Sequence, residues 1–259
     1  MSRVPGEPEE RFVKRAAGAP DAFFASEAAG LRWLAEPQAV RVPSVLSVDR
    51  THISMTRVHV GEPRPGAAER FGRGLATLHS SGSEGFGAPW PGFIGPLPMD
   101  NGGGDDWASF YRERRVLPFL EQALASGAIG PQDAEAVRAV LALAPHLPGA
   151  GEAPSRIHGD LWSGNVLWAT DGEVWLIDPA AQGGHRETDL AMLALFGVPF
   201  LDRILDAYME CAPLAPGWRD RVAVHQLHPL LVHAVLFAGG YGHRAGAVAR
   251  EALRRLGPP

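Results

Sequence analysis

The chain has 259 residues, of which 46% are hydrophobic and 20% are charged, and its formal net charge is −5. This length can bury one large core or two small lobes. The modest negative charge gives no general attraction for nucleic acid or anionic membranes, so we expect neither as a partner.

The residues at the start of the chain and the cysteine count indicate where the protein works. Met1 to Glu10 is polar, with no apolar leader, and no apolar run reaches the roughly 20 residues that span a bilayer. A single cysteine, Cys211, excludes an internal disulfide framework. We therefore expect a cytoplasmic protein. We also expect it to be a monomer.

The N-terminal part predicts a strand followed by a helix. Residues 11–14 end a short strand, and Asp21 is expected to cap a helix over 22–35. Glu27 falls inside the apolar stripe of that helix, where an unpaired carboxylate costs several kcal/mol. Its nearest cationic candidate is Lys14, the only lysine among 24 basic residues. The alternative is that Glu27 lies at the edge of the stripe and reaches water.

The chain then changes from strand to helix. Two alternating β-branched runs, 40–48 and 51–58, predict paired strands, and the Pro/Gly-rich run 61–66 predicts a linker. A helix ending near His79 precedes a long loop over 80–104. Further helices are predicted over 106–118, capped by Asp106 and bent near Pro118, and over 131–144, 189–196, 200–209, 218–237 and 245–256.

A compact β segment interrupts these helices and carries the chemistry. Asp171-Gly172 lies between two short apolar runs, which is a strong hairpin signal. Because a hairpin folds back on itself, Asn165 at its start and Asp178 at its end should lie side by side. Asp160 lies in the loop just before them.

These three side chains predict a metal-dependent phosphoryl-transfer site. Their hard oxygen atoms suit Mg²⁺, which takes one or two protein ligands and completes its octahedron with water and phosphate. Asp160 and Asn165 also have the spacing of a kinase catalytic loop, in which the Asp orients the attacking hydroxyl and the Asn holds a metal. The alternative is a polar loop without catalytic function.

Three segments of the chain carry a resemblance to a known family: His158 to Asn165, Ile177 to Ala180 and Arg186 to Met192. Through them the sequence resembles the fructosamine kinase (ketosamine 3-kinase) family, within the aminoglycoside and choline phosphotransferase group. Similarity extends over most of the chain, and Trp162 in the loop favours fructosamine kinases over their relatives.

The resemblance implies a fold of the α+β class, with the two lobes of a protein kinase: a small β-rich N-lobe over 1–58, a linker over 59–66 and a larger, mainly helical C-lobe over 67–259. It also implies ATP and Mg²⁺ as co-substrates and phosphorylation of a sugar hydroxyl on a ketosamine. Asp160 would be the catalytic base, and Asn165 and Asp178 the metal ligands. Lys14, paired with Glu27, would contact the ATP phosphates.

The resemblance assigns further roles to three groups of residues. The hinge beside adenine would contain Met55, Thr56 and Val58. Structural support for the catalytic loop would come from His79, His158 and Asp189. Contacts to the acceptor sugar would come from three aromatic side chains, Trp107, Tyr111 and Trp162. Aromatic residues at helical spacing are, however, more often part of a core.

One departure from the family concerns the segment before Lys14. Related enzymes place a first strand and a glycine-rich phosphate loop there, whereas Met1 to Arg11 contains one glycine, Gly6, and the acidic residues Glu7, Glu9 and Glu10. A chain without that loop would bind ATP weakly. The missing loop leaves open a non-catalytic, pseudokinase-like nucleotide-binding protein. A second alternative is a kinase of the same fold that acts on another amino-sugar or an aminoglycoside.

Overall fold

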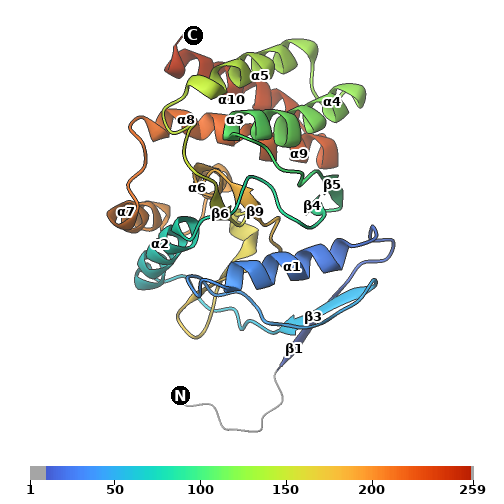
Figure 1. Cartoon of the computed structure of the whole chain (residues 1–259), viewed down its shortest axis with the longest axis vertical. Helices are drawn as coiled ribbons and strands as arrows, with labels where there is room; N and C mark the ends of the chain where they lie inside the picture. The colour runs from blue at the N-terminus through green and yellow to red at the C-terminus, as the bar shows by residue number, and fades with distance from the viewer. Residues whose placement is uncertain (1–9, 258–259) are drawn as a thin grey trace.

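The computed structural model describes residues 10–257 and has two lobes. A small sheet and one helix form the N-terminal lobe, drawn in blue at the lower end of Figure 1, and the C-terminal helices lie at the opposite end. The predicted segment around Gly6, Glu7 and Glu9 lies outside the described residues.

The N-terminal lobe is a three-stranded antiparallel sheet covered by one helix. Its strands are β1 (Arg11–Arg15), β2 (Val45–Val48) and β3 (His52–Thr56), in the order β1-β3-β2. Helix α1 (Phe23–Ala35) buries Phe24 and Leu31 against Ile53 and Met55 of β3. The predicted strands and the helix are therefore present, and their apolar faces form a separate small core.

The start of α1 differs from the prediction. Ala22 is the N-cap residue and adopts a left-handed backbone with φ of 65°, and no side chain caps the helix. Asp21 instead lies 3.3 Å from Arg50 at the surface. The predicted cap at Asp21 is wrong, because the left-handed turn at Ala22 takes that side chain away from the first helical N–H groups.

The rest of the chain forms a larger, mainly helical lobe with three two-stranded sheets. The α-helices are α2 (Pro65–Ser80), α3 (Trp107–Phe110), α4 (Leu117–Ala125), α5 (Pro131–Leu143), α6 (Glu187–Phe196), α7 (Leu201–Cys211), α8 (Trp218–His225), α9 (Leu227–Phe237) and α10 (Tyr241–Leu256). The strands are β4 (Gly92–Ile94), β5 (Leu97–Met99), β6 (Ser155–Ile157), β7 (Val166–Trp168), β8 (Val174–Leu176) and β9 (Gln182–Gly184). Short 3-10 turns are η2 (Ala144–His146) and η3 (Ser163–Asn165), and a π-helix, η1 (Tyr111–Val116), joins α3 to α4.

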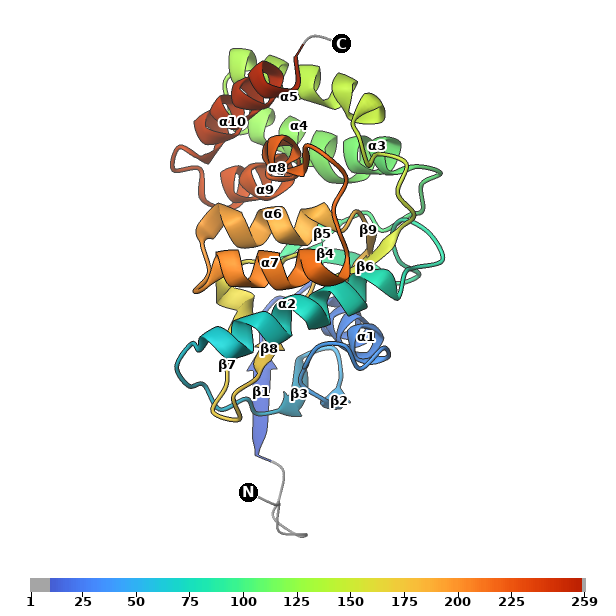
Figure 2. The same cartoon turned by 90° about the vertical axis from the view of Figure 1, so that its left-hand side faces the viewer.

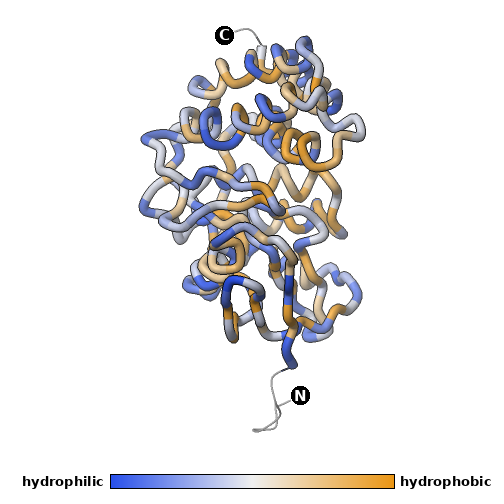
Figure 3. Tube along the Cα trace, turned by 90° about the vertical axis from the view of Figure 1, so that its right-hand side faces the viewer, coloured by the Kyte–Doolittle hydropathy of each residue, from blue (hydrophilic) through white to orange (hydrophobic). Residues whose placement is uncertain are grey.

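Two apolar cores stabilise this lobe. One joins α2, α6, α7 and the β7–β8 hairpin. In Figure 2, α2, α6 and α7 lie between the small lobe and the outer helices. The other joins the outer helices α4, α5, α9 and α10. In Figure 3, hydrophobic residues, drawn in orange, form long stretches in the helices of this lobe. Within residues 10–257, no helix has the length and apolarity required to cross a bilayer.

The predicted helix over 218–237 is two helices. Pro229 has no N–H and its ring clashes with the carbonyl four residues earlier, which belongs to His225. Helix α8 ends at His225 and α9 begins at Leu227.

Near Pro118, where the sequence predicted a bend, the type of helix changes. The π-helix η1 ends two residues before Pro118, which cannot bond the carbonyl of Arg114. The guanidinium of Arg115 donates to that carbonyl instead, at 2.9 Å. At the other end of this helical segment, Asp106 accepts a hydrogen bond from the backbone of Ser109, so the predicted cap is confirmed.

The predicted long loop over 80–104 contains a β-hairpin. β4 pairs with β5 in the register Phe93↔Pro98, and Gly95 and Pro96 form the turn. The high proline content hid these strands, since proline is rare inside a sheet. This hairpin lies beside α1 and shapes the candidate site.

Candidate active site

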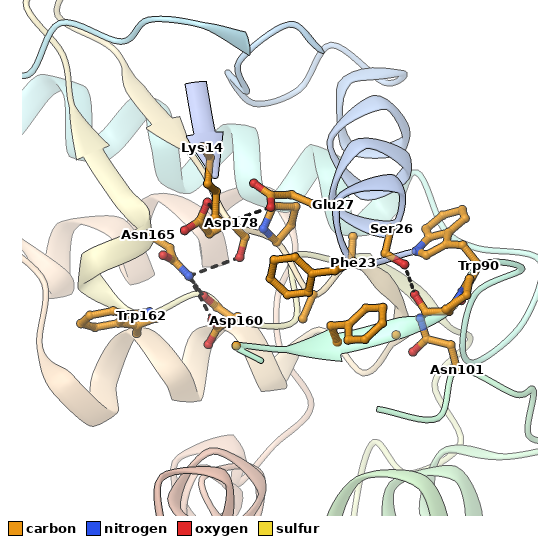
Figure 4. A pocket seen from close by; sticks show the side chains of 17 residues that line it. Lys14, Phe23, Ser26, Glu27, Trp90, Asn101, Asp160, Trp162, Asn165 and Asp178 are labelled. Atoms are coloured by element: carbon orange, nitrogen blue, oxygen red, sulfur yellow. Dashed lines mark hydrogen bonds and ion pairs between the residues drawn. The ribbon is translucent and has the colours of Figure 1, made fainter. Parts of the chain in front are cut away.

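A cavity of about 210 Å³ lies between the two lobes and is lined by polar residues from both (Figure 4). The N-terminal lobe contributes Lys14 and Glu27, and the larger lobe contributes Asp160, Asn165 and Asp178. The sequence predicted that these five side chains would meet, and the structure brings all of them to one cavity.

Local backbone geometry explains how the loop and the hairpin converge. β7 pairs with β8 in the register Val166↔Leu176, which brings the ends of the hairpin together. The amide nitrogen of Asn165 donates to the backbone carbonyl of Asp160 at 2.8 Å and to its carboxylate at 3.1 Å. The same nitrogen lies 3.4 Å from the carbonyl of Asp178. One amide thus joins the loop to the far end of the hairpin.

Lys14 connects the two lobes electrostatically. Its ammonium lies 2.9 Å from a carboxylate oxygen of Glu27 and 2.9 Å from one of Asp178. The expected pairing of Lys14 with Glu27 is therefore present, and the contact with Asp178 was not predicted. Because β1 and α1 hold Lys14 on one side of the cleft and the hairpin holds Asp178 on the other, this ion pair spans the cleft.

The backbone of Asp178 is strained. Its φ is 52°, in the left-handed region that a residue with a Cβ rarely adopts. Such conformations cost roughly 1–3 kcal/mol and are concentrated at functional sites. Gly159 also has a positive φ, of 81°, and a Cβ there would overlap the carbonyl of Ala180. The turn before Asp160 therefore requires glycine.

Asp189 of α6 holds the loop that carries Asp160. Its carboxylate accepts the N–H groups of His158 at 2.7 Å and Gly159 at 2.9 Å, and lies 3.1 Å from Nε2 of His79. The other ring nitrogen of His79 lies 2.9 Å from the hydroxyl of Tyr208 on α7. His79, His158, Asp189 and Tyr208 are all buried, so the loop rests on a dry hydrogen-bonded network.

The electrostatic environment shifts the pKa values of Asp160 and Asp189 in opposite directions. Burial raises the pKa of Asp160 to about 7, and Asp178 and Asp189 add to that effect while Asn165 opposes it. Burial alone would also raise the pKa of Asp189, but its hydrogen bonds with His79 and the loop hold that pKa below its ordinary value. Asp189 thus stays ionised, whereas Asp160 has the raised pKa of a general base that works near neutral pH.

Lys14 is charged despite its partial burial. Burial alone would lower the pKa of Lys14, but the carboxylates of Glu27 and Asp178 raise it above its ordinary value. Burial raises the pKa of Glu27, and the Lys14 ammonium opposes that shift. Lys14 therefore presents a fixed positive charge to the cavity.

Several predicted residues lie elsewhere. Met55 and Thr56 end β3 at the start of the connection between the lobes, with Val58 just beyond, and none of the three lines the cavity. Trp107 is buried, with 2% of its surface exposed, and stacks on Tyr111 and His225. The predicted acceptor contact is wrong for Trp107 and Tyr111, because both belong to the helical core. Trp162, by contrast, lines the cavity and is 37% exposed.

The sequence did not predict one whole wall of the cavity. This wall comes from the start of α1 and from the segment around the β4–β5 hairpin, and its side chains are Phe23, Ser26, Trp90, Phe93 and Asn101. Two three-residue apolar runs around Gly95-Pro96 were the signal for the hairpin. The hydroxyl of Ser26 donates to the carbonyl of Pro91 at 2.5 Å, which ties α1 to this wall.

The donor set fits a divalent cation. The Asn165 amide nitrogen is bonded to Asp160, which leaves its carbonyl oxygen as the available ligand atom. Asp178 offers a carboxylate that is 43% exposed. Hard oxygen ligands of this kind, few in number and open to the cavity, match the preference of Mg²⁺.

Comparison with known proteins is consistent with this geometry. The family model described as fructosamine kinase matches residues 2–255. The "probable ketoamine kinase" of Synechocystis sp. is 34% identical over 256 residues, covering 97% of this chain and 85% of that protein. The chloroplastic protein-ribulosamine 3-kinase of Arabidopsis thaliana is 32% identical, covering 95% of this chain and 76% of that protein.

Solved structures agree on the fold. A crystal structure from Thermobifida fusca YX-ER1, provisionally named a fructosamine-3-kinase, superposes with a TM-score of 0.90 and 53% identity, covering 94% of this chain and 85% of that one. Choline kinase LicA from Streptococcus pneumoniae superposes with a TM-score of 0.59 at 16% identity, covering 96% and 85% of the two chains, which shows the fold alone. The predicted two-lobed, kinase-like α+β fold is therefore confirmed.

Proposed function

Because the chain belongs to the fructosamine kinase family, we propose that it transfers the γ-phosphoryl group of ATP to a sugar hydroxyl of a ketosamine. The observation that carries the proposal is the meeting of Asp160, Asn165, Asp178 and Lys14 in one cavity between the lobes. Phosphoryl transfer needs charge neutralisation and positioning more than covalent help from the protein, and this set of residues supplies both.

Asp160 orients the acceptor. Its carboxylate accepts a hydrogen bond from the acceptor hydroxyl and takes the proton as the hydroxyl oxygen bonds to the γ-phosphorus. The bond between that phosphorus and the leaving oxygen breaks, so the products are ADP and a phosphorylated sugar. The pKa of about 7 makes Asp160 ionised in a useful fraction at neutral pH and still basic enough to take a proton.

Lys14 and the two oxygen ligands act on the phosphates. We propose that Asn165 and Asp178 hold Mg²⁺, which would neutralise charge on the phosphate oxygens. Lys14 adds a positive charge on the opposite side of the cleft, and Glu27 keeps its ammonium pointing into the cavity at 2.9 Å. Met55, Thr56 and Val58 would lie beside adenine at the connection between the lobes.

Trp162 is the aromatic residue best placed to contact the sugar. It lies two residues after Asp160, and its exposed indole lines the same cavity. A flat aromatic face packs against the C–H groups of a sugar ring. We therefore propose that Trp162 positions the acceptor for Asp160.

The test is ATP consumption with fructoselysine by the protein and by Asp160→Asn. We expect the substitution to lower kcat by roughly 10²–10⁴ with little change in ATP affinity, because only the proton acceptor is lost. Asp206→Asn on α7, an exposed carboxylate outside the cavity, is the matched control and should be unaffected. A near-normal rate in Asp160→Asn would remove Asp160 from the mechanism. A panel of aminoglycosides, run beside fructoselysine, tests the competing acceptor class.

A further inference from the structure

A second, larger cavity lies across the β4–β5 hairpin from the catalytic cavity. It measures about 720 Å³ and shares five lining residues with the catalytic cavity: Trp90, Pro91, Gly92, Phe93 and Asn101. Figure 4 shows Trp90 and Asn101 at the end of the catalytic cavity that is farthest from Trp162. The two cavities thus adjoin along one thin wall.

The catalytic cavity is too small for a complete ketosamine on a large carrier. Its volume of about 210 Å³ is below the roughly 300–1,000 Å³ of sites that enclose drug-sized ligands. It must also receive the γ-phosphate beside Lys14 and Asp178. A sugar ring therefore fills it, and whatever is attached to the sugar amine has to lie outside.

The second cavity has the chemistry to receive that attachment. Beyond the shared wall it is lined by Pro98 and Phe119, which give it an apolar floor. Arg114 and Asp100 also line it and form an ion pair with partly exposed side chains. An apolar channel that ends at paired charges suits a hydrocarbon chain followed by polar peptide groups.

A buried arginine fixes the wall between the cavities. Arg115, presented by the π-helix η1, donates to the carbonyl of Asp100 at 2.5 Å and to the side chain of Asn101 at 2.8 Å, and it also bonds Gln182 of β9. Only 2% of Arg115 is exposed. The wall is therefore bonded to β9, in the β6–β9 sheet. This bonding fixes the position of the two cavities relative to each other.

We propose that the second cavity is a subsite for the carrier of the acceptor, namely the side chain and flanking backbone of a peptide lysine whose ε-amine bears the sugar. This inference rests on the proposed function. The four methylene groups of lysine cross the wall over Trp90 and Phe93, because long side chains lay their carbon stems along apolar surfaces. Peptide groups then reach Arg114 and Asp100, the polar pair of this subsite.

The test compares two acceptors that differ in the carrier. One is a short peptide with fructose on the ε-amine of an internal lysine, and the other is N-fructosylglycine, which has no spacer and no peptide. Pro98→Trp fills the second cavity from an exposed position of β5 that does not line the catalytic cavity. We expect this variant to lower kcat/KM for the glycated peptide by about tenfold or more, mainly because KM rises. The value of kcat/KM for N-fructosylglycine should change less than about twofold.

A control variant completes the design. Pro131→Trp adds the same indole at the exposed start of α5, outside both cavities. It should leave kcat/KM for both acceptors unchanged. Equal losses for the two acceptors in Pro98→Trp, or no loss for the peptide, would overturn the subsite. Failure of the unmodified protein to phosphorylate either acceptor would instead overturn the proposed function.

Discussion

The composition of the chain singles out Lys14, and the geometry of the cleft explains why a lysine is needed there. The chain has 24 basic residues, and all except Lys14 are arginine. In the structure its ammonium lies 2.9 Å from each of two carboxylates on opposite sides of the cleft. A compact ammonium can bond two acids in different directions, whereas a guanidinium is planar and wider. The position therefore requires lysine although the charge alone does not.

The substitution Lys14→Arg tests this requirement. We expect kcat/KM for ATP to fall about tenfold to a hundredfold, because a charged hydrogen bond worth about 1.5–3 kcal/mol is lost or misdirected. ATP consumption measures the effect. The neighbouring exposed Arg15 gives the reverse exchange, Arg15→Lys, which should be silent. Full activity in Lys14→Arg would show that charge alone is sufficient.

Two buried histidines contribute to the dependence of stability on pH. Burial lowers the pKa of His185 to about 4 and that of His228 to about 3, from 6.5. Both rings are therefore neutral in the folded protein, while the unfolded chain binds a proton near pH 6.5. Between about pH 6.5 and 4 the unfolded state binds more protons at these two sites, so the two histidines lower the free energy of unfolding as the pH falls. The raised pKa of Asp160 contributes in the opposite direction.

Urea unfolding at pH 7.5, 6 and 5 measures this dependence. Each histidine should contribute about 1.4 kcal/mol per pH unit inside the window. We expect His185→Asn to be less stable than the unmodified protein at pH 7.5 but to lose less stability on acidification. His243→Asn is the control, because His243 is 80% exposed on the side chain and should not change the slope. An unchanged slope in His185→Asn would contradict the assignment.

At the scale of elements, the packing of α2 on α7 supports the catalytic loop. His79 lies on α2, Tyr208 on α7 and Asp189 on α6, and their hydrogen bonds join the three helices beneath the loop. The helices approach closely at Gly72, where a Cβ would overlap the carbonyl of Ile204. The distance between α2 and α7 thus depends on Gly72, a residue that does not line the cavity.

The substitution Gly72→Ala should separate these helices. We expect a loss of roughly 1–3 kcal/mol in the free energy of unfolding, typical of overpacking, and a reduced kcat because the loop support moves. Gly66→Ala lies on the same helix, where the nearest atom is the flexible side chain of Arg70 at 3.6 Å. It should leave activity unchanged and raise stability by up to about 1 kcal/mol. Equal effects of the two substitutions would argue against close packing as the cause.

At the scale of the whole molecule, the site is shared between two separately packed lobes. The small lobe has its own core around Phe24 and Ile53, and the larger lobe has two. Lys14 and Asp178 face each other across the boundary, at 2.9 Å. A nucleotide bound there contacts both lobes and so stabilises their relative position as well as each fold.

Thermal unfolding should therefore report nucleotide binding. We expect ATP with Mg²⁺ to raise Tm, since a ligand at a hundred times its Kd stabilises by about 2.7 kcal/mol. ATP with a chelator should give a smaller rise. Asp178→Asn should abolish the difference between these two conditions while leaving Tm without nucleotide nearly unchanged. An equal Mg²⁺-dependent rise in that variant would exclude Asp178 as a ligand.

Elements with local signals could be predicted from the order of the residues alone. Asp171-Gly172 predicted the hairpin, and a hairpin can only bring Asn165 and Asp178 together. A carboxylate inside an apolar stripe predicted the partner of Glu27. Such features follow from neighbouring residues and from the cost of burying charge, and they do not depend on how distant helices pack.

Features that arise from contacts between distant segments became visible only in the folded molecule. It placed Lys14 against Asp178 as well as Glu27, and it buried Trp107 in the helical core. It also brought the β4–β5 hairpin to the catalytic cavity, from a segment whose glycines and prolines resemble a loop. The physical reason is that packing and side-chain direction depend on partners far along the chain, which no local pattern of residues encodes.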